Sequence, residues 1–134
     1  MADASIEQTK LDTSVTIPYA FSGSEMLLNK FGEGFHKGIT VTCPGFFGPQ
    51  GRVLRLGLSS PGLVEKLTHF NFNNHRITNF EMETSAIYGL GKLMGHECLS
   101  INVIIANRVI KEFSKDSEAA VENMIRKALE ALTS

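Results

Sequence analysis

The stretch Arg76-Ile-Thr-Asn-Phe-Glu-Met-Glu-Thr-Ser-Ala-Ile-Tyr-Gly-Leu-Gly-Lys-Leu-Met94 decides the fold class of this chain. Its first part, residues 76–80, is typical of a short strand that leads into the acidic segment 81–83. A helix is predicted directly after it, because one face carries apolar side chains at helical spacing: Ala86, Ile87, Leu90, Leu93 and Met94. A strand followed at once by a helix is a building unit of α/β folds.

The rest of the chain repeats this alternation. Residues 39–43 alternate apolar and polar side chains and end at Pro44, which predicts a second strand. Residues 99–106 form a nearly continuous apolar and β-branched run, as expected for a strand buried on both faces. Further helices are expected after a capping box that begins at Ser22, after Ser60-Pro61, and over residues 115–132. Alternating helices and strands indicate an α/β fold.

Length and composition limit the classes of protein that the chain can belong to. At 134 residues and 14.7 kDa we expect one domain, at residues 17–134, after a polar leader at residues 1–16. The net charge of −1 and the lack of a basic stripe argue against a nucleic-acid partner. No signal peptide is recognisable, and the longest apolar run is too short to cross a bilayer. A cytoplasmic protein without a membrane partner is expected.

The cysteines and histidines indicate no metal site. Cys43 and Cys98 lie far apart in apolar runs, which predicts two small buried thiols in a reducing compartment. The four histidines are isolated and do not have the spacing of metal ligands. Gly89 and Gly91 lie within a helical pattern rather than after a strand, so they do not form a phosphate loop.

The loop at residues 45–53, Gly-Phe-Phe-Gly-Pro-Gln-Gly-Arg-Val, carries side chains that suit a pyrimidine base. The Gln50 amide offers one donor and one acceptor, which match the adjacent carbonyl and N–H groups of such a ring. Arg52 can donate a charge-assisted hydrogen bond to a carbonyl oxygen, and Phe46 or Phe47 can stack on the base. An ordinary Gly/Pro turn with a solvated arginine has the same composition, so both interpretations stay open here.

Glu81 and Glu83 lie at the expected strand-to-helix junction and are too close together to act as acid and base on opposite sides of a substrate. A ribose suits them better, because its two cis hydroxyls can both donate to one carboxylate. Negative charge there also favours a cationic, oxocarbenium-like sugar. The alternative is a pair of acids that complement the helix macrodipole. Asn107-Arg108 follow the predicted strand 99–106 at its carboxyl end, where α/β folds often bind ligands.

Taken in order, three segments resemble the nucleoside phosphorylase superfamily, and within it the uridine phosphorylases. They are PQGR at 49–52, FEMET at 80–84 and VIIANR at 103–108. The resemblance runs from about Ile17 to the C-terminus. It implies the C-terminal half of the family's three-layer α/β fold with a mixed central sheet, without the N-terminal half.

The resemblance also implies roles in base binding. Gln50 and Arg52 would bind the edge of uracil, Phe46 would line the base pocket, and Ile105 and Ala106 would form apolar walls. Purine-specific relatives place an aspartate near the end of the last strand. Here Asn107 follows Ala106, which favours a pyrimidine.

The implied reaction is phosphorolysis, in which inorganic phosphate attacks C1′ of uridine to give ribose 1-phosphate and uracil. Glu83 would hold the ribose, supported by Glu81 and Met82, and Arg52 would stabilise the charge that grows on the departing uracil. Arg52 and Glu83 are thus the expected catalytic residues. Phosphate is the co-substrate, and neither a metal nor an organic cofactor is expected.

Two further implications concern assembly and activity. Relatives complete the site with a neighbouring subunit, so a homo-oligomer is expected. The family's phosphate-binding Arg-x-Gly-Thr-x-Gly segment does not occur here, so we expect this chain by itself to be inactive. Two other hypotheses remain: a non-catalytic remnant that oligomerises or binds nucleosides, and a phosphorylase or nucleosidase for another nucleoside.

Overall fold

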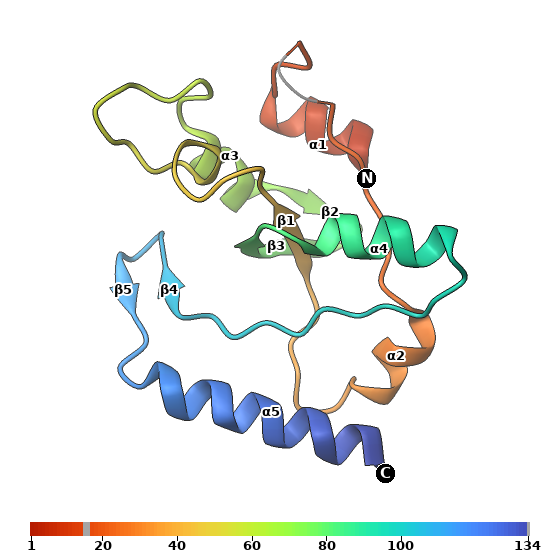
Figure 1. The fold of residues 1–134 in the computed structure, drawn as a ribbon. Coiled ribbons are helices and arrows are strands. Elements are labelled where there is room, and N and C mark those ends of the chain that lie inside the picture. Colours follow the sequence, from red (N-terminus) through yellow and green to blue (C-terminus); the bar gives the residue numbers. More distant parts are fainter. Residues whose placement is uncertain (15–16, 134) are drawn as a thin grey trace. The chain divides into compact units, whose positions relative to one another are not determined.

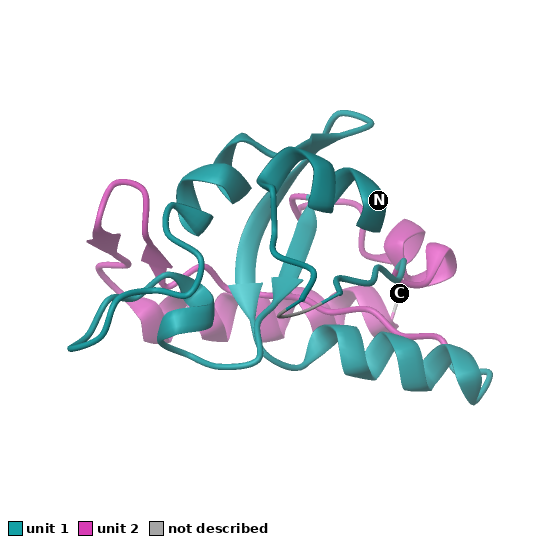
Figure 2. Cartoon of the chain, turned by 90° about the horizontal axis from the view of Figure 1, so that it is seen from above, with its two compact units in different colours: residues 1–22, 37–96 teal, residues 23–36, 97–134 magenta. Residues whose placement is uncertain are grey.

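The computed structural model describes residues 1–14 and 17–133, which fall into two compact units (Figures 1 and 2). The first unit comprises Met1–Ser22 and Lys37–His96, and the second comprises Gly23–His36 and Glu97–Ser134. Helices and strands occur in both units, and the sheet of the first unit is mixed. The predicted α/β fold class with a mixed sheet is confirmed.

The sheet of the first unit contains three strands in the order β1-β3-β2. Strand β1 (Ile39–Thr42) is parallel to β3 (His75–Glu81), and β2 (Asn71–Phe72) is antiparallel to β3. Asn73 and Asn74 join β2 to β3 with φ angles of 50° and 64°. Two consecutive residues with positive φ form the tight turn that matches the twist of a hairpin, and asparagine tolerates this conformation.

Two α-helices of the first unit contact its sheet. Helix α4 (Thr84–Leu93) follows β3 directly, as the sequence predicted, and contacts β1. Helix α3 (Leu63–His69) contacts β3 and begins later than the predicted start at Ser60-Pro61. The reason is Gly62, which adopts a left-handed conformation with φ of 72° at the helix N-cap. The buried core includes Cys43, Leu67 and Phe70.

Helix α1 (Ala2–Thr9) lies in the segment that the sequence predicted to be a polar leader. It contacts α3, and its last residue, Thr9, is buried. The Gln8 side chain also exchanges two hydrogen bonds with the backbone of Asn71, at 2.9 and 3.1 Å. Part of the expected leader is therefore packed against the rest of the first unit, while the expected domain boundary at residue 17 stays a prediction.

The second unit contains α2 (Glu25–Lys30), β4 (Ala106–Asn107), β5 (Glu112–Phe113) and α5 (Ser117–Thr133). The predicted helix over residues 115–132 is confirmed by α5. The predicted capping box at Ser22 is wrong, because the cap of α2 is Ser24. Its side chain accepts a hydrogen bond from the Leu27 amide at 3.2 Å, and its own amide donates to the Cys98 carbonyl at 2.8 Å.

The predicted strand over residues 99–106 is also wrong. Only its last residue, Ala106, is in a strand, where it pairs with Phe113 in a short hairpin. An apolar run shows that a segment can be buried, but a strand also needs a neighbour to complete its backbone hydrogen bonds.

The thiol prediction is right for Cys43, which is buried, whereas Cys98 is only half-buried. Within residues 1–14 and 17–133, no helix is both long and apolar enough to span a membrane.

Candidate functional site

Two of the predicted motifs begin at neighbouring strand ends. Strands β1 and β3 run in the same direction, so their carboxyl ends lie at one edge of the sheet (Figure 2). Residues 45–53, the Gln-Arg loop, follow β1, and residues 81–83, the acidic junction, lie where β3 meets α4. The Cys43 amide donates to the Glu81 carbonyl at 2.9 Å, just beyond the end of β1. This edge is where ligand crevices of α/β folds usually lie.

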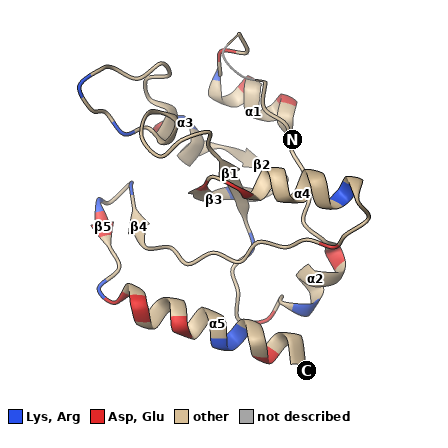
Figure 3. Cartoon of the chain, viewed as in Figure 1, with Lys and Arg blue, Asp and Glu red and all other residues tan. Residues whose placement is uncertain are grey.

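Charges of opposite sign mark the two motifs. Acidic residues lie at the junction of β3 with α4, and basic residues lie on the loop between β1 and α3 (Figure 3). A site between such groups suits a neutral ligand that presents carbonyl oxygens at one end and hydroxyl groups at the other, because carbonyls accept from cations and hydroxyls donate to carboxylates.

The Gln-Arg loop turns through a short 3-10 helix, η1 (Gly48–Gln50), and then through Gly51 with φ of 75°. The side chain of Gln50 is only 4% exposed, which limits its movement. A Cβ atom on Gly51 would lie 2.4 Å from the Cγ2 atom of Val64. Glycine is therefore required between the two predicted base ligands, both for the backbone angle and for the close packing against α3.

The structure brings Arg52, Gln50 and Phe46 together. One terminal nitrogen of Arg52 donates to the Gln50 side-chain oxygen at 3.0 Å and to the Phe46 carbonyl oxygen. The guanidinium carbon lies 3.5 Å from the centre of the Phe46 ring. Phe47 packs edge-on against Phe46, with ring centres 5.3 Å apart, and about half of each ring is exposed. The loop thus combines a flat aromatic surface, a cation and an ordered amide.

At the acidic junction, both oxygens of the Glu81 carboxylate accept hydrogen bonds from other groups of the protein. One carboxylate oxygen accepts from the Thr42 hydroxyl, and the other accepts from the amides of Glu83 and Thr84 at 2.7 and 2.6 Å. Partial burial raises the pKa of Glu81, but these hydrogen bonds and one from the Thr84 side chain outweigh it. The pKa of Glu81 therefore lies below its usual value. Glu81 is held as a carboxylate that caps the first turn of α4.

Glu83 is in a different situation from Glu81. It occupies the N-cap position of α4, where its side chain makes no capping hydrogen bond, and it is exposed. Met82, between the two acids, is 43% exposed. The resemblance places all three residues at the ribose, but the structure separates a Glu81 carboxylate that bonds to the backbone from a Glu83 carboxylate that faces solvent. Thr42 was not among the predicted site residues, although its position as the last residue of β1 could have revealed it.

Ile105 and Ala106 lie in the second unit. The Ile105 carbonyl accepts from the Ser114 amide at 2.7 Å, and both predicted wall residues are exposed. The side chain of Asn107 accepts from the amides of Val109 and Ile110 at 3.0 and 3.3 Å, so it shapes the turn between β4 and β5. A role of Ile105 and Ala106 beside a base stays a prediction.

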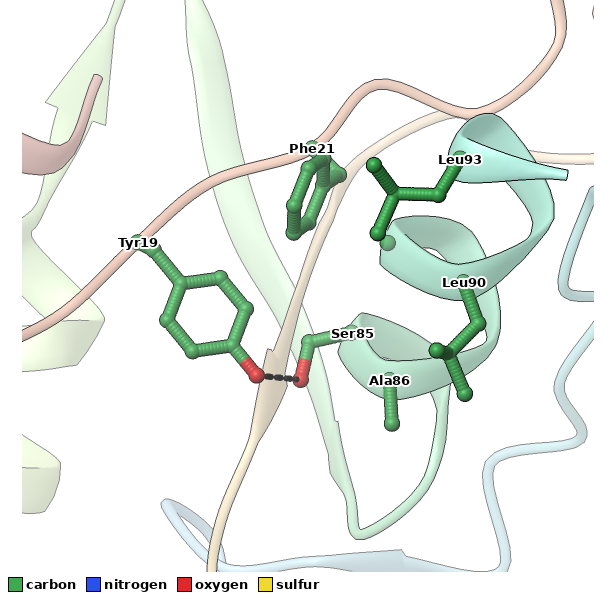
Figure 4. A pocket seen from close by; sticks show the side chains of 7 residues that line it. Tyr19, Phe21, Ser85, Ala86, Leu90 and Leu93 are labelled. Atoms are coloured by element: carbon green, nitrogen blue, oxygen red, sulfur yellow. Dashed lines mark hydrogen bonds between the residues drawn. The ribbon is translucent and has the colours of Figure 1, made fainter.

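A hollow of about 320 Å³ lies beside α4 (Figure 4), and no residue of the Gln-Arg loop lines it. Its lining is mainly apolar: Tyr19, Phe21, Ser85, Ala86, Gly89, Leu90 and Leu93. The Tyr19 and Ser85 hydroxyls lie 3.1 Å apart and share one hydrogen bond (Figure 4). The lining has no charged group to orient a polar substrate, so we place the candidate site at the sheet edge instead.

Comparisons with known proteins bear on the family of the chain. The sequence profile described as the phosphorylase superfamily matches residues 9–133. A uridine phosphorylase from Thermococcus kodakarensis is 32% identical over 103 residues, which are 75% of this chain and 36% of that protein. The chain thus spans about a third of the length of this curated relative. No solved structure matches the chain.

Proposed function

The chain belongs to the phosphorylase superfamily, and from this membership we propose that its first unit binds uridine for phosphorolysis. The observation that carries the proposal is the parallel pairing of β1 with β3. Because of this pairing, the Gln-Arg loop and the acidic junction both begin at the same edge of the sheet. The base would lie at the loop and the ribose at the junction.

The loop supplies the groups that a uracil ring needs. Arg52 carries five N–H donors, and only one of its nitrogens bonds to Phe46 and Gln50. The guanidinium therefore keeps donors for a carbonyl oxygen of the base. As the glycosidic bond breaks, negative charge grows on uracil, and a cation at this oxygen stabilises the transition state more than the ground state.

The acidic junction supplies the sugar contact. The exposed Glu83 carboxylate is suited to accept from the 2′ and 3′ hydroxyls of ribose, and its charge opposes the positive charge that develops at C1′. Glu81 contributes indirectly, through its bonds to the amides of Glu83 and Thr84. The catalytic pair of this proposal is therefore Arg52 and Glu83.

The remaining parts of the proposal rest on the family. Inorganic phosphate would be the co-substrate, without a metal or an organic cofactor, in a cytoplasmic homo-oligomer. The family's phosphate-binding segment is not among residues 1–134, so we propose that this chain by itself binds uridine without releasing uracil. Positioning of phosphate in line with C1′ is needed for the reaction, and such orientation can lower the barrier by about 7–11 kcal/mol.

The test is a titration of the full, isotope-labelled chain with uridine, uracil, thymidine and inosine, followed by NMR. We expect uridine to shift the signals of Gln50, Arg52 and Glu83 and to bind more tightly than inosine. A second assay measures uracil release from uridine in excess phosphate, and we expect none. Absence of binding by all four compounds, or a preference for inosine, would overturn the proposal. Phosphate-dependent release of uracil would overturn only the expected inactivity.

A further inference from the structure

We infer that Thr42 is a positioning residue for the proposed sugar site, acting through Glu81 and the first turn of α4 to set the direction of Glu83. This inference rests on the proposed function, because Glu83 needs a fixed direction only if it binds a ligand. It assigns a task to a residue on a different strand from the acids.

Thr42 makes two hydrogen bonds with its side chain. Its hydroxyl donates to the Glu81 carboxylate and accepts from the Ser85 amide at 2.9 Å. A hydroxyl offers one donor and two acceptor sites, so both kinds are in use. Thr42 is therefore bonded to the end of β3 and to the first turn of α4 at the same time.

The side chains of Thr42 and Glu81 accept from the first backbone amides of α4 and of the residue before it. The first amides of a helix have no partner within the helix. Here the amides of Glu83 and Thr84 donate to Glu81, and the amide of Ser85 donates to Thr42. The backbone of Glu83 is thus fixed by groups other than its own side chain. Its carboxylate is left for a ligand, in agreement with the lack of a side-chain capping bond.

Strands β1 and β3 carry a second, similar side-chain contact at Thr40. Thr40 and Thr42 are two residues apart on β1 and are in register with Asn79 and Glu81 on β3. The Thr40 hydroxyl donates to the Asn79 side chain, as the Thr42 hydroxyl donates to Glu81. Both contacts connect β1 to β3, but only the contact at Thr42 also reaches α4. Thr40→Val is therefore a matched control for the loss of a cross-strand hydrogen bond.

The experiment compares the affinities of the full chain for uridine and uracil. The ratio of the two reports the sugar contact, because both ligands share the base. We expect Thr42→Val to lower this ratio by about tenfold, the effect of one weakened hydrogen bond to a charged group, while the affinity for uracil stays unchanged. Thr42→Ser keeps the hydroxyl and should restore the ratio. Thr40→Val should leave it as in the unmodified chain.

A second measurement tests the inference whether or not the chain binds nucleosides. Hydrogen exchange followed by NMR should show faster exchange at the amides of Glu83, Thr84 and Ser85 in Thr42→Val, and no such change in Thr40→Val. If Thr42→Val does not fold, Thr42→Ala removes the same two hydrogen bonds with a smaller side chain and should give the same result.

The outcomes separate failure of the inference from failure of the function. Unchanged exchange in Thr42→Val, or an equal loss of the affinity ratio in Thr40→Val, would overturn the role of Thr42. If the unmodified chain binds neither ligand, the function fails. The positioning of Glu83 by Thr42 is then decided by hydrogen exchange alone.

Discussion

The guanidinium carbon of Arg52 lies 3.5 Å from the centre of the Phe46 ring, and the same side chain donates to the Phe46 carbonyl oxygen. A cation over an aromatic face is attracted to the ring by about 0.5–2 kcal/mol, depending on its exposure. The contact therefore keeps Arg52 close to its place at the sheet edge before any ligand binds. Ordering such a side chain in advance reduces the entropy lost on binding.

The first prediction concerns this arginine. Arg52→Ala should weaken the binding of uracil and uridine equally, by at least about tenfold, because a hydrogen bond to a charged group contributes about 1.5–3 kcal/mol. The measurement is isothermal titration calorimetry with both ligands. Arg55→Ala is the matched control, since Arg55 is an exposed arginine on the same connection between β1 and α3. An equal loss in both variants would mean that Arg52 acts only through general charge.

The second prediction separates the sugar contact from the stability of the fold. Glu83→Gln keeps the shape of the side chain but removes its charge and one acceptor oxygen. Uridine binding should weaken by about tenfold, uracil binding should stay the same, and the melting temperature should change little, because the Glu83 side chain makes no capping bond. Exposed Glu65 in α3 provides the control variant Glu65→Gln. A large drop in melting temperature for Glu83→Gln alone would make Glu83 a structural residue.

The third prediction follows from the lowered pKa of Glu81. Burial raises this pKa, but the hydrogen bonds from Thr42, Glu83 and Thr84 lower it further than burial raises it. A carboxylate whose pKa is lower in the folded state stabilises the fold above its unfolded pKa, about 4.3 for glutamate. This stabilisation is lost as the pH falls through the folded pKa.

The check for Glu81 is a series of urea unfolding curves for the unmodified chain and Glu81→Gln. The difference between their free energies of unfolding should be largest near neutral pH and should shrink as the pH falls below about 4.3. A difference that does not vary with pH would show that Glu81 does not act through its charge.

Local sequence patterns predicted much of the first unit. The alternation at residues 39–43 and the helical spacing after Glu83 correspond to β1 and α4, because each element is specified by its own residues. The segment 99–106 is different, since a strand depends on a partner that its own residues do not specify. The helix start at Leu63 was also missed, because Gly62 adopts a left-handed conformation that Ser60-Pro61 does not indicate.

In the candidate site too, contacts between residues close in sequence were predictable, and contacts between distant residues were not. Arg52, Gln50 and Phe46 are close in sequence, and the structure brings them together as that spacing suggests. The spacing of Glu81 and Glu83 did not predict that the first would bond to backbone amides and the second would be exposed. This difference depends on the register of β1 against β3, which places Thr42 opposite Glu81. Register is a long-range property of the sheet, and a single segment does not reveal it.

The fourth prediction concerns Gly51, which lies between the two proposed base ligands. Gly51→Ala should destabilise the fold by about 1–3 kcal/mol, because φ of 75° is unfavourable for alanine. The new Cβ would also lie 2.4 Å from the Val64 Cγ2 atom. Relief of this overlap would move the loop away from α3 and displace Gln50 and Arg52. The affinity for uracil should therefore fall together with stability.

Gly48→Ala is the control, because Gly48 belongs to the same 3-10 turn but has no atom within 4 Å of an added Cβ. Its effect on stability should stay within about 0.5 kcal/mol, as for most exposed substitutions. Urea unfolding and uracil titration of both variants make the comparison. Equal stabilities would show that the loop does not need glycine at residue 51. A stable Gly51→Ala variant that loses uracil binding would show instead that the backbone angle serves the site and not the fold.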